Sequence, residues 1–415
     1  MRIARRSFIA GAASAALPFA GTGSATAAQP LALRRGVNLW PWFSLTREFP
    51  APRTDYDWPP FQLDRPVPTA LDLARLRRSG LDFVRIPVDP GPFLAGSAAT
   101  RLALIGQVMA AVAEALRSDL SVILNLQVNA ATHHWNVARI VDGLEAPAFP
   151  AYRDLVGALA ARLSDFDRGR VALEPVNEPP QSCGAPAWTR MQQALLGAAR
   201  HAAPQLTLVA TGSCGSMVQG IEALSAKSLA AFEPLLFTFH FYEPYLFSHQ
   251  GAPWMSEPVY RSLNAVPWPA SKGSLTATLA AVRARMAEDR ERSEQAKRAA
   301  YAETERVLKV YFDAQPDRRF VDGYLRKVRA WAEREGIAPG RVLMGEFGAL
   351  RSDARYVAAP AEDRARYIAD VRESAEAFGF PWAFWNAFDG MGLMDDVTRQ
   401  FDPPIVRALG LSLVP

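Results

Sequence analysis

Short apolar runs alternate with longer segments of helical periodicity along most of the chain. Proline, glycine or polar residues bound the short runs, which is typical of buried strands, whereas the longer segments predict amphipathic helices. The predicted strands are 35–40, 81–86, 120–126, a run that starts at 171, 206–210, 234–240, 341–348 and 380–385. The predicted helices are 70–79, 101–117, 152–166, 188–202, 321–335, 361–377 and 403–410.

The order of these elements predicts the fold. Eight strands alternate with helices, and no glycine-rich phosphate-binding motif follows the first strand, so a (β/α)8 TIM barrel is favoured over a doubly wound nucleotide-binding fold. The helix at 70–79 has the clearest ends, because Thr69 can cap it and Gly80 follows its last residue. We therefore predict one barrel domain over 29–415.

A long insertion separates the sixth and seventh predicted strands, at about 243–335, far beyond an ordinary crossover. It opens with aromatic residues in a loop that we expect to roof the barrel mouth: Tyr245, Phe247, Trp254 and Trp268. An apolar helical stripe follows at Leu275, Leu279, Val282 and Met286. From 287 to 300 the sequence is almost wholly charged, with Glu288 and Arg292 at i,i+4 spacing, and predicts a solvated projecting helix.

The first 28 residues have the pattern of an export signal. Arg5 and Arg6 precede a weakly apolar stretch rich in alanine and glycine, and Ala25-Thr26-Ala27 is a small-residue cleavage pattern. We therefore expect a twin-arginine signal peptide at 1–28, and a mature protein that is periplasmic or secreted.

Charge and hydropathy narrow the class of partner. The formal net charge is +4, but three of the 46 basic residues lie in the leader, so the rest nearly balance the 42 acidic residues. No basic surface is predicted, which argues against nucleic acid and anionic membranes as partners. Since no apolar run after the leader reaches the ~20 residues of a membrane span, we expect no membrane anchor. We expect a monomer.

The two cysteines, Cys183 and Cys214, follow the fourth and fifth predicted strands, so their loops are neighbours on the barrel rim. After export they would meet an oxidising compartment, and we hypothesise a disulfide there. Two buried free thiols are the alternative.

Polar and aromatic residues end the predicted strands. In a parallel barrel the carboxyl ends of all strands form one rim, where barrel enzymes keep their catalytic groups. Each residue alone has a structural explanation, such as a salt bridge or core packing, but a set at successive strand ends points to a site. The residues are Trp40, Arg85, Gln127, Asn177 with Glu178, His240 with Tyr242, Glu346, and Trp385.

These residues resemble the retaining glycoside hydrolases of family 5, the cellulase family. The resemblance covers nearly the whole mature chain, and its motifs are Phe83-Val-Arg-Ile-Pro87, Asn177-Glu-Pro179, His240-Phe-Tyr242, Gly345-Glu-Phe-Gly348 and Trp385. It implies that Glu178 is the general acid/base and Glu346 the nucleophile. The residues it implies around the substrate are Arg85, Asn177, His240, Tyr242 and Trp385.

One strand end departs from the family, which usually has a histidine where this sequence has Gln127. His133 and His134, a few residues on, are candidates to supply an imidazole from the loop. Because this position lines the glycone side in the family, the departure affects substrate preference more than mechanism.

The residues themselves predict the same chemistry. A retaining site needs two carboxyl groups ~5 Å apart, one protonated to assist the leaving group and one ionised to attack. Arg85 and a hydrogen bond from Tyr242 would keep Glu346 ionised, and repulsion would favour the protonated form of Glu178. Asn177 suits the sugar 2-hydroxyl. Candidates for stacking on sugar rings are Trp40, Trp42, Trp135, Trp254 and Trp385.

We therefore predict an exported hydrolase that acts on a β-linked glucan or a related polysaccharide by double displacement, without cofactor or metal. A metal-dependent hydrolase would use His133, His134 and His240, but the sequence lacks a His-Glu-x-x-His motif. A non-catalytic sugar-binding barrel is an alternative, although such a protein should have lost one carboxylate. A β-mannanase and a glycosidase for glycolipid headgroups stay open on the same fold.

Overall fold

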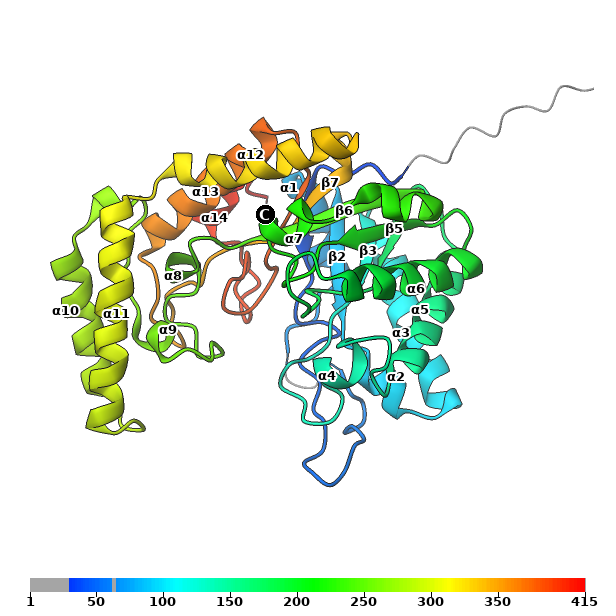
Figure 1. The fold of residues 1–415 in the computed structure, drawn as a ribbon, viewed down its shortest axis with the longest axis horizontal. Coiled ribbons are helices and arrows are strands. Elements are labelled where there is room, and N and C mark those ends of the chain that lie inside the picture. Colours follow the sequence, from blue (N-terminus) through cyan, green and yellow to red (C-terminus); the bar gives the residue numbers. More distant parts are fainter. Residues whose placement is uncertain (1–29, 62–64, 415) are drawn as a thin grey trace, which may run out of the picture.

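Eight parallel strands close into a barrel in which each strand pairs with the next and β8 pairs with β1 (Figure 1). The structure is a computed structural model that describes residues 30–61 and 65–414, so the expected signal peptide lies outside the described residues. The strands are β1 Arg35–Asn38, β2 Phe83–Val88, β3 Ser121–Leu126, β4 Val171–Glu174, β5 Thr207–Thr211, β6 Leu235–Phe241, β7 Val342–Phe347 and β8 Trp382–Phe384. The predicted (β/α)8 barrel is confirmed.

Helices surround the barrel and connect its strands. The longer ones are α1 Ala70–Ser79, α3 Ala98–Arg117, α5 Phe149–Leu163, α6 Pro186–Ala202, α12 Arg318–Glu335 and α13 Ala361–Ala377. The shorter ones are α2 Gly91–Ala95, α4 Val137–Ile140, α7 Val218–Glu222 and α14 Pro403–Ala408. In α1 both predicted ends are confirmed: Thr69 and Asp72 form a reciprocal capping box, and Gly80 has a φ of 112°.

Helix α3 corrects one expectation from the sequence. Among the described residues it is the helix that is long and apolar enough to cross a membrane by length and composition. Its residues Leu104, Val108 and Val112 are buried, however, and the helix packs on β3. The apolar character of α3 therefore follows from its place in the helical layer of the barrel.

The alternation of side chains along the strands gives the barrel interior two layers. Near the amino ends the inward residues are apolar and form one cluster, which includes Phe83, Ile123, Ala172, Leu236 and Leu343. Two positions further along the same strands, inward residues become polar, because successive side chains alternate between faces. This upper layer includes Asn38, Arg85, Asn125, Glu174 and Thr238, all of which are buried.

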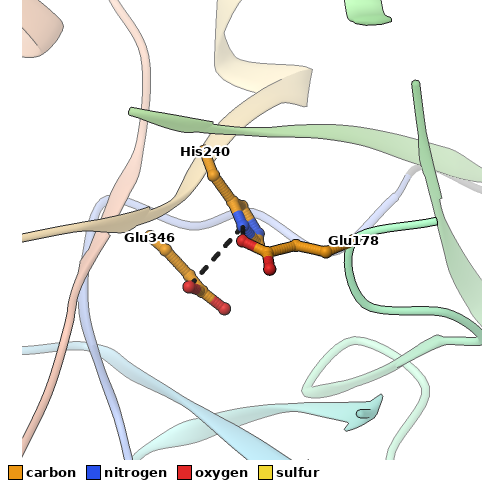
Figure 2. A group of neighbouring side chains, drawn as sticks. All are labelled: Glu178, His240 and Glu346. Atoms are coloured by element: carbon orange, nitrogen blue, oxygen red, sulfur yellow. Dashed lines mark hydrogen bonds and ion pairs between the residues drawn. The ribbon is translucent and has the colours of Figure 1, made fainter. Parts of the chain in front are cut away.

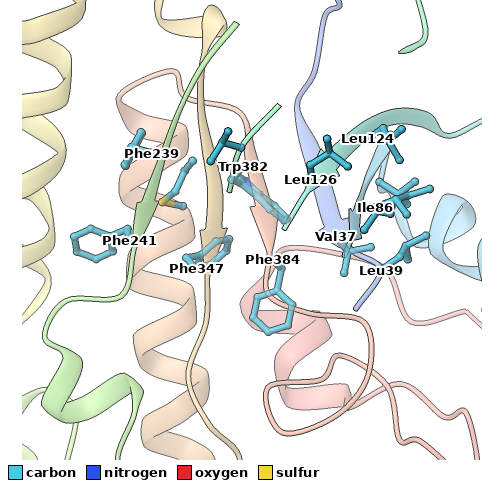
Figure 3. Close-up of a cluster of buried hydrophobic side chains, with 14 of the residues drawn as sticks. Val37, Leu39, Ile86, Leu124, Leu126, Phe239, Phe241, Phe347, Trp382 and Phe384 are labelled. Carbon is cyan, nitrogen blue, oxygen red and sulfur yellow. The ribbon is translucent and has the colours of Figure 1, made fainter. Parts of the chain in front are cut away.

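The outward residues of the strands form the main core with the helices. Val37, Ile86, Leu124, Phe239 and Phe347 belong to this large buried cluster (Figure 3). Strands that are buried on both faces explain the nearly continuous apolar runs in the sequence. The polar upper layer is then the exception that needs a functional explanation.

Four α-helices lie between β6 and α12, namely α8 Tyr245–Ser248, α9 Pro258–Ser262, α10 Leu275–Glu288 and α11 Glu294–Ala314. The prediction of one projecting helix through 287–300 is wrong. Helix α10 ends at Glu288, the carboxylate of Asp289 accepts backbone hydrogen bonds from Glu291 and Arg292, and α11 then begins. The two helices run side by side away from the barrel, at the left of Figure 1.

The aromatic residues of this segment divide into two groups. Phe247 and Trp268 are fully buried, their ring centroids are 5.7 Å apart, and the indole of Trp268 donates a hydrogen bond to Asp370. Trp254, by contrast, is 52% exposed. The expectation that Phe247 and Trp268 roof the barrel mouth is therefore wrong, since both belong to the core.

A disulfide joins Cys183 and Cys214, which are 31 residues apart, so the hypothesised bond is confirmed. It links the loops that follow β4 and β5. Two backbone hydrogen bonds hold the same loops together: the amide of Cys214 donates to Gln181 at 2.7 Å, and that of Gly215 donates to Pro179 at 2.9 Å. The segment that contains Glu178 is therefore anchored to its neighbour.

Candidate active site

Glu346 lies in β7 at the barrel rim, and hydrogen bonds reach both of its oxygens. An irregularity in the pairing of β6 and β7 places His240 opposite Glu346. The Nη1 of Arg85 donates to Oε1 at 2.8 Å, and the hydroxyl of Tyr242 donates to Oε2 at 2.9 Å. The carboxylate is buried, with 4% of its side chain exposed, and its orientation is fixed from two sides.

Arg85 is the centre of a buried network in the upper layer. It contacts Glu174 through two hydrogen bonds, of 2.7 Å from Nε and 2.8 Å from Nη2. It also donates to the side-chain oxygens of Asn38, at 2.9 Å, and Asn177, at 2.7 Å. Burial alone would lower the pKa of Arg85, but the charges of Glu174 and Glu346 outweigh it and hold the pKa above its usual value.

Sequence reasoning missed Glu174 and Asn38. For Glu174 the signal was the period-two alternation, because it lies two positions after Ala172 of the lower layer. Asn38 lies opposite Arg85 in the register of β1 and β2. Glu174 was hidden because it ends an apolar strand three residues before the more conspicuous Asn177-Glu178 pair.

Glu178 lies in the loop after β4, where its backbone has a left-handed φ of 45°. Its side chain is 39% exposed, and its Oε1 lies 2.8 Å from Nδ1 of His240 (Figure 2). One oxygen of Glu178 lies within 4.8 Å of one oxygen of Glu346. That separation fits the ~5–5.5 Å of retaining glycosidases and is too short for the ~6.5–9.5 Å of inverting ones.

His240 lies between the two carboxylates. Its Nδ1 is 2.8 Å from Glu178 and 3.5 Å from Glu346. Burial would lower the pKa of His240, but the charges of Glu346 and Glu178 outweigh it and raise the pKa above its usual value. Its Nε2 is buried and has no partner among the described residues, so His240 contacts both carboxylates through Nδ1.

The ionisation of Glu346 is a balance between burial and its neighbours. Burial raises the pKa of Glu346 above its usual value, and the charge of Glu178 adds to this effect. The charges of His240 and Arg85 and the hydrogen bond from Tyr242 act in the opposite direction. The ionised form therefore depends on these donors.

Trp40 and Trp385 form an aromatic pair beside this network. Both are half-buried, and their ring centroids are 5.3 Å apart at an angle of 43°. Trp385 packs in one cluster with Tyr242. Trp42 does not belong to this pair, because it is buried in the main core and stacks on Phe43, so its proposed contact with sugar is wrong.

Gln127 follows the last residue of β3, and its half-buried side chain has an oxygen without a partner among the described residues. The nearby histidines contact a different segment. The carboxylate of Glu48 accepts hydrogen bonds from the backbone amides of His133, His134 and Trp135. These contacts tie the loop to residues 48–56 and give no support for an imidazole that replaces the family histidine.

Glu178, His240 and Glu346 are also the group of described residues that could hold a metal ion. Their ligand atoms are already in use, because Glu346 accepts from Arg85 and Tyr242, and Nδ1 of His240 contacts Glu178. A cation would also lie close to the guanidinium of Arg85. The arrangement therefore suits two carboxyl groups that act as acid/base and nucleophile.

Comparisons with known proteins agree with this chemistry. The family model for cellulase, glycosyl hydrolase family 5, matches residues 57–390. Endoglucanase 3 of Fibrobacter succinogenes is 24% identical over 231 residues, which cover 55% of this chain and 31% of that protein. The match thus spans about a third of the length of this relative.

Solved structures are similar in fold. The cellulose synthase subunit Z from Clostridioides difficile has a TM-score of 0.65 and 18% identity, over 91% of this chain and 99% of that chain. A hyperthermophilic endo-β-1,4-glucanase, solved in complex with substrate, has a TM-score of 0.64 and 20% identity, over 91% and 97% of the chains. Both likenesses extend over nearly the whole described barrel.

Proposed function

Because the chain belongs to glycosyl hydrolase family 5, the cellulase family, we propose that it hydrolyses a β-linked glucan with retention of anomeric configuration. Glu346 is the nucleophile and Glu178 the general acid/base. The observation that carries this proposal is the approach of their oxygens to within 4.8 Å, which leaves no room for a water between nucleophile and sugar.

The surroundings of the two carboxyl groups support this division of roles. Glu346 is buried and accepts hydrogen bonds from Arg85 and Tyr242, which favour a fixed, ionised group aimed from below the sugar. Glu178 is 39% exposed and contacts His240 through one oxygen, so it is accessible to a leaving group and to water. An acid that must later act as a base needs this access.

The reaction has two steps. In the first, an oxygen of Glu346 attacks the anomeric carbon, the bond to the leaving oxygen breaks, and Glu178 gives its proton to that oxygen. In the second, Glu178 takes a proton from water, the water oxygen attacks the anomeric carbon, and Glu346 departs as a carboxylate. Two inversions give net retention, and both groups return to their starting forms.

Asn177 is oriented for the sugar. Its Oδ1 accepts from Nη2 of Arg85 at 2.7 Å, which leaves the amide nitrogen to donate. A donor at this place can bond the 2-hydroxyl oxygen, a contact that strengthens in the transition state. Trp385 and Trp40 offer apolar ring surface for the hydrophobic side of a pyranose.

A screen of linkage-defined oligosaccharides against the mature protein tests this function. We expect cleavage of β-glucans, with β-1,4-linked chains as the first choice because two relatives carry the names endoglucanase and endo-β-1,4-glucanase. Nuclear magnetic resonance should show that the first product is the β-anomer. An initial α-anomer would contradict retention. Cleavage of β-mannan or glycolipid headgroups alone would show that the substrate is not a β-glucan. Binding without cleavage would favour a sugar-binding barrel.

The mature enzyme is exported to the periplasm or medium through the twin-arginine route. Arg5 and Arg6, together with the cleavage pattern that ends at Ala27, support this proposal. Replacement of both arginines by lysine should leave the precursor in the cytoplasm. Normal export of that variant would contradict it.

A further inference from the structure

A cavity outside the catalytic centre lies against the segment between β6 and β7. Its volume is about 280 Å³, close to the ~300 Å³ of the smaller ligand pockets. Its walls come from residues 251–262, from the turn between α10 and α11, and from residues 355–356 of the loop after β7. Neither Glu178 nor Glu346 lines it.

The cavity has an aromatic wall with an exposed indole at its edge. Tyr356 lines it, next to Pro253. Trp254 follows in the chain, is 52% exposed, and lies edge-on to Tyr356 with ring centroids 6.1 Å apart. This arrangement leaves a large part of the indole open to a ligand, although the aromatic edge contact holds it in place.

Polar groups with unused hydrogen-bonding capacity complete the walls. Arg292 pairs with Asp289 and donates from Nη2 to Ser262 at 2.6 Å, but its Nη1 is buried without a partner among the described residues. Arg261 is exposed and has no ionic partner in the described chain. A buried donor without an acceptor is costly, so Nη1 favours a ligand that can accept a hydrogen bond.

The walls are held to the barrel. Arg355 pairs with Asp389 at 3.2 Å and with Asp396 at 3.0 Å, both in the loop after β8. Gly251 has a φ of 80°, and a β carbon there would lie 2.0 Å from the carbonyl oxygen of Val357, so only glycine permits this close approach of the two loops. The cavity is therefore a built feature of the barrel rim.

The charges that line the cavity nearly cancel. Arg292 and Arg355 are already paired with aspartates. Arg285 is also paired, because it contacts Glu288 at 3.1 Å. This leaves Arg261 and Glu291, which have opposite signs. An anionic ligand would need an excess of positive charge, so the balance favours a neutral ligand with many hydroxyl groups.

The cavity is linked to the catalytic centre through Tyr356. Its ring packs in one apolar cluster with Tyr242 and Trp385. A β carbon at Gly390 would lie 3.1 Å from the ring of Tyr356, so this ring covers the loop that follows β8. One apolar cluster therefore connects the catalytic rim to Tyr356, and Tyr356 in turn contacts Trp254.

We propose that this cavity, with Trp254 at its edge, is a distal subsite that binds one neutral sugar unit of a polysaccharide chain. This inference rests on the proposed function and deepens it, since it makes the enzyme selective for chains that extend from the catalytic centre to α10 and α11. Binding of a sugar unit in this cavity would raise kcat/KM for substrates long enough to reach it. Short substrates, which cannot reach it, would be unaffected.

The test compares long and short substrates of whichever oligosaccharide series the wild-type enzyme cleaves. Trp254→Ala and Arg261→Ala should each lower kcat/KM for a hexasaccharide by roughly five- to tenfold, the effect of one lost aromatic or polar contact. Both should leave kcat/KM for a short aryl glycoside unchanged. Trp254→Phe keeps a ring and should retain most of the hexasaccharide activity.

Arg298→Ala is the matched control, because Arg298 is also exposed, lies on α11 and does not line the cavity. If the ratio of long to short activity in Trp254→Ala and Arg261→Ala equals that of Arg298→Ala, the distal subsite is wrong while the proposed function stands. If wild-type enzyme prefers uronic-acid oligosaccharides through these residues, the neutral ligand is wrong. If the wild-type enzyme cleaves no glycoside, the proposed function itself fails.

Discussion

Arg85 and Glu174 face each other inside the barrel and are joined by two hydrogen bonds, of 2.7 Å and 2.8 Å, with neither side chain exposed. This bidentate contact fixes the plane of the guanidinium group. Its Nη1 is then directed at Glu346, 2.8 Å away. The orientation of the proposed nucleophile therefore depends on a carboxylate that does not touch it.

Glu174→Ala should destabilise the protein and reduce kcat. The substitution leaves the buried charge of Arg85 without its main partner. The free energy of unfolding should therefore fall by about 3–5 kcal/mol, and urea unfolding would measure the loss. Glu174→Gln keeps the side-chain volume and one hydrogen-bond acceptor, so it should lose less stability than Glu174→Ala. Glu303→Ala, which breaks the exposed pair with Arg306 on α11, is the control and should barely change the midpoint. Equal midpoints for Glu174→Ala and Glu303→Ala would contradict this account.

Trp254 and Trp268, which lie between β6 and α12, should differ in their contribution to stability. Trp268→Ala removes a fully buried ring and its hydrogen bond to Asp370, and should cost about 3–5 kcal/mol of unfolding free energy. Trp254→Ala alters an exposed ring and should stay within about 0.5 kcal/mol of wild type. Thermal or urea unfolding of both variants decides the point, and a similar loss in both would show that Trp268 is not a core residue.

His249 should make stability depend on pH. It is buried against Tyr242 and Tyr245, and burial lowers its pKa to about 4 although the charge of Glu178 acts in the opposite direction. The unfolded chain has the usual pKa of about 6.5 and binds a proton first as pH falls. The stabilisation is therefore complete above about pH 6.5 and is lost as pH falls towards 4, by up to about 3 kcal/mol.

Urea unfolding of wild type and His249→Phe at pH 7 and pH 4.5 tests this linkage. The phenylalanine keeps a ring of similar size but cannot titrate. The advantage of the wild type over His249→Phe should shrink at the lower pH. Parallel losses of stability in the two proteins would assign the acid sensitivity to other groups.

The disulfide should stabilise the loop that holds Glu178. Replacing Cys183 and Cys214 by serine opens a 31-residue connection and should cost about 3–4 kcal/mol in the chain-entropy model. Because the loop is anchored through the same region, kcat should fall most for substrates whose leaving group needs protonation. Reduced wild type should match the double serine variant, and identical activity and stability with and without reductant would refute this role.

Local signals in the sequence were enough to predict both ends of α1, but not the break between α10 and α11. In α1 the cap at Thr69 and the glycine at Gly80 act within a few residues, so the predicted helix agrees with the structure. In α10 and α11 the charged spacing of Glu288 and Arg292 suggested a continuous helix. Backbone hydrogen bonds to Asp289 and the packing of the two helices on each other override that local preference.

The predicted strand ends were enough to locate the catalytic site, but they did not reveal Glu174 and Asn38, which contact Arg85. Arg85 lies within β2 and not at its end, and its 2.8 Å contact with Glu346 of β7 is made inside the barrel. The burial of Trp42 and Trp268 depends on contacts with distant segments, which no local pattern reports. Aromatic residues in loops therefore needed the structure to divide them into core and surface.

The most direct test of the central claim is the fate of an activated aryl glycoside with two alanine variants in added azide. In Glu178→Ala, attack by Glu346 needs no acid when the leaving group is good, so a glycosyl-enzyme should accumulate, and azide should release it as a glycosyl azide of retained configuration. Glu346→Ala should form no such intermediate. A glycosyl azide of retained configuration from Glu346→Ala, with no glycosyl-enzyme formed by Glu178→Ala, would show that the two roles are exchanged.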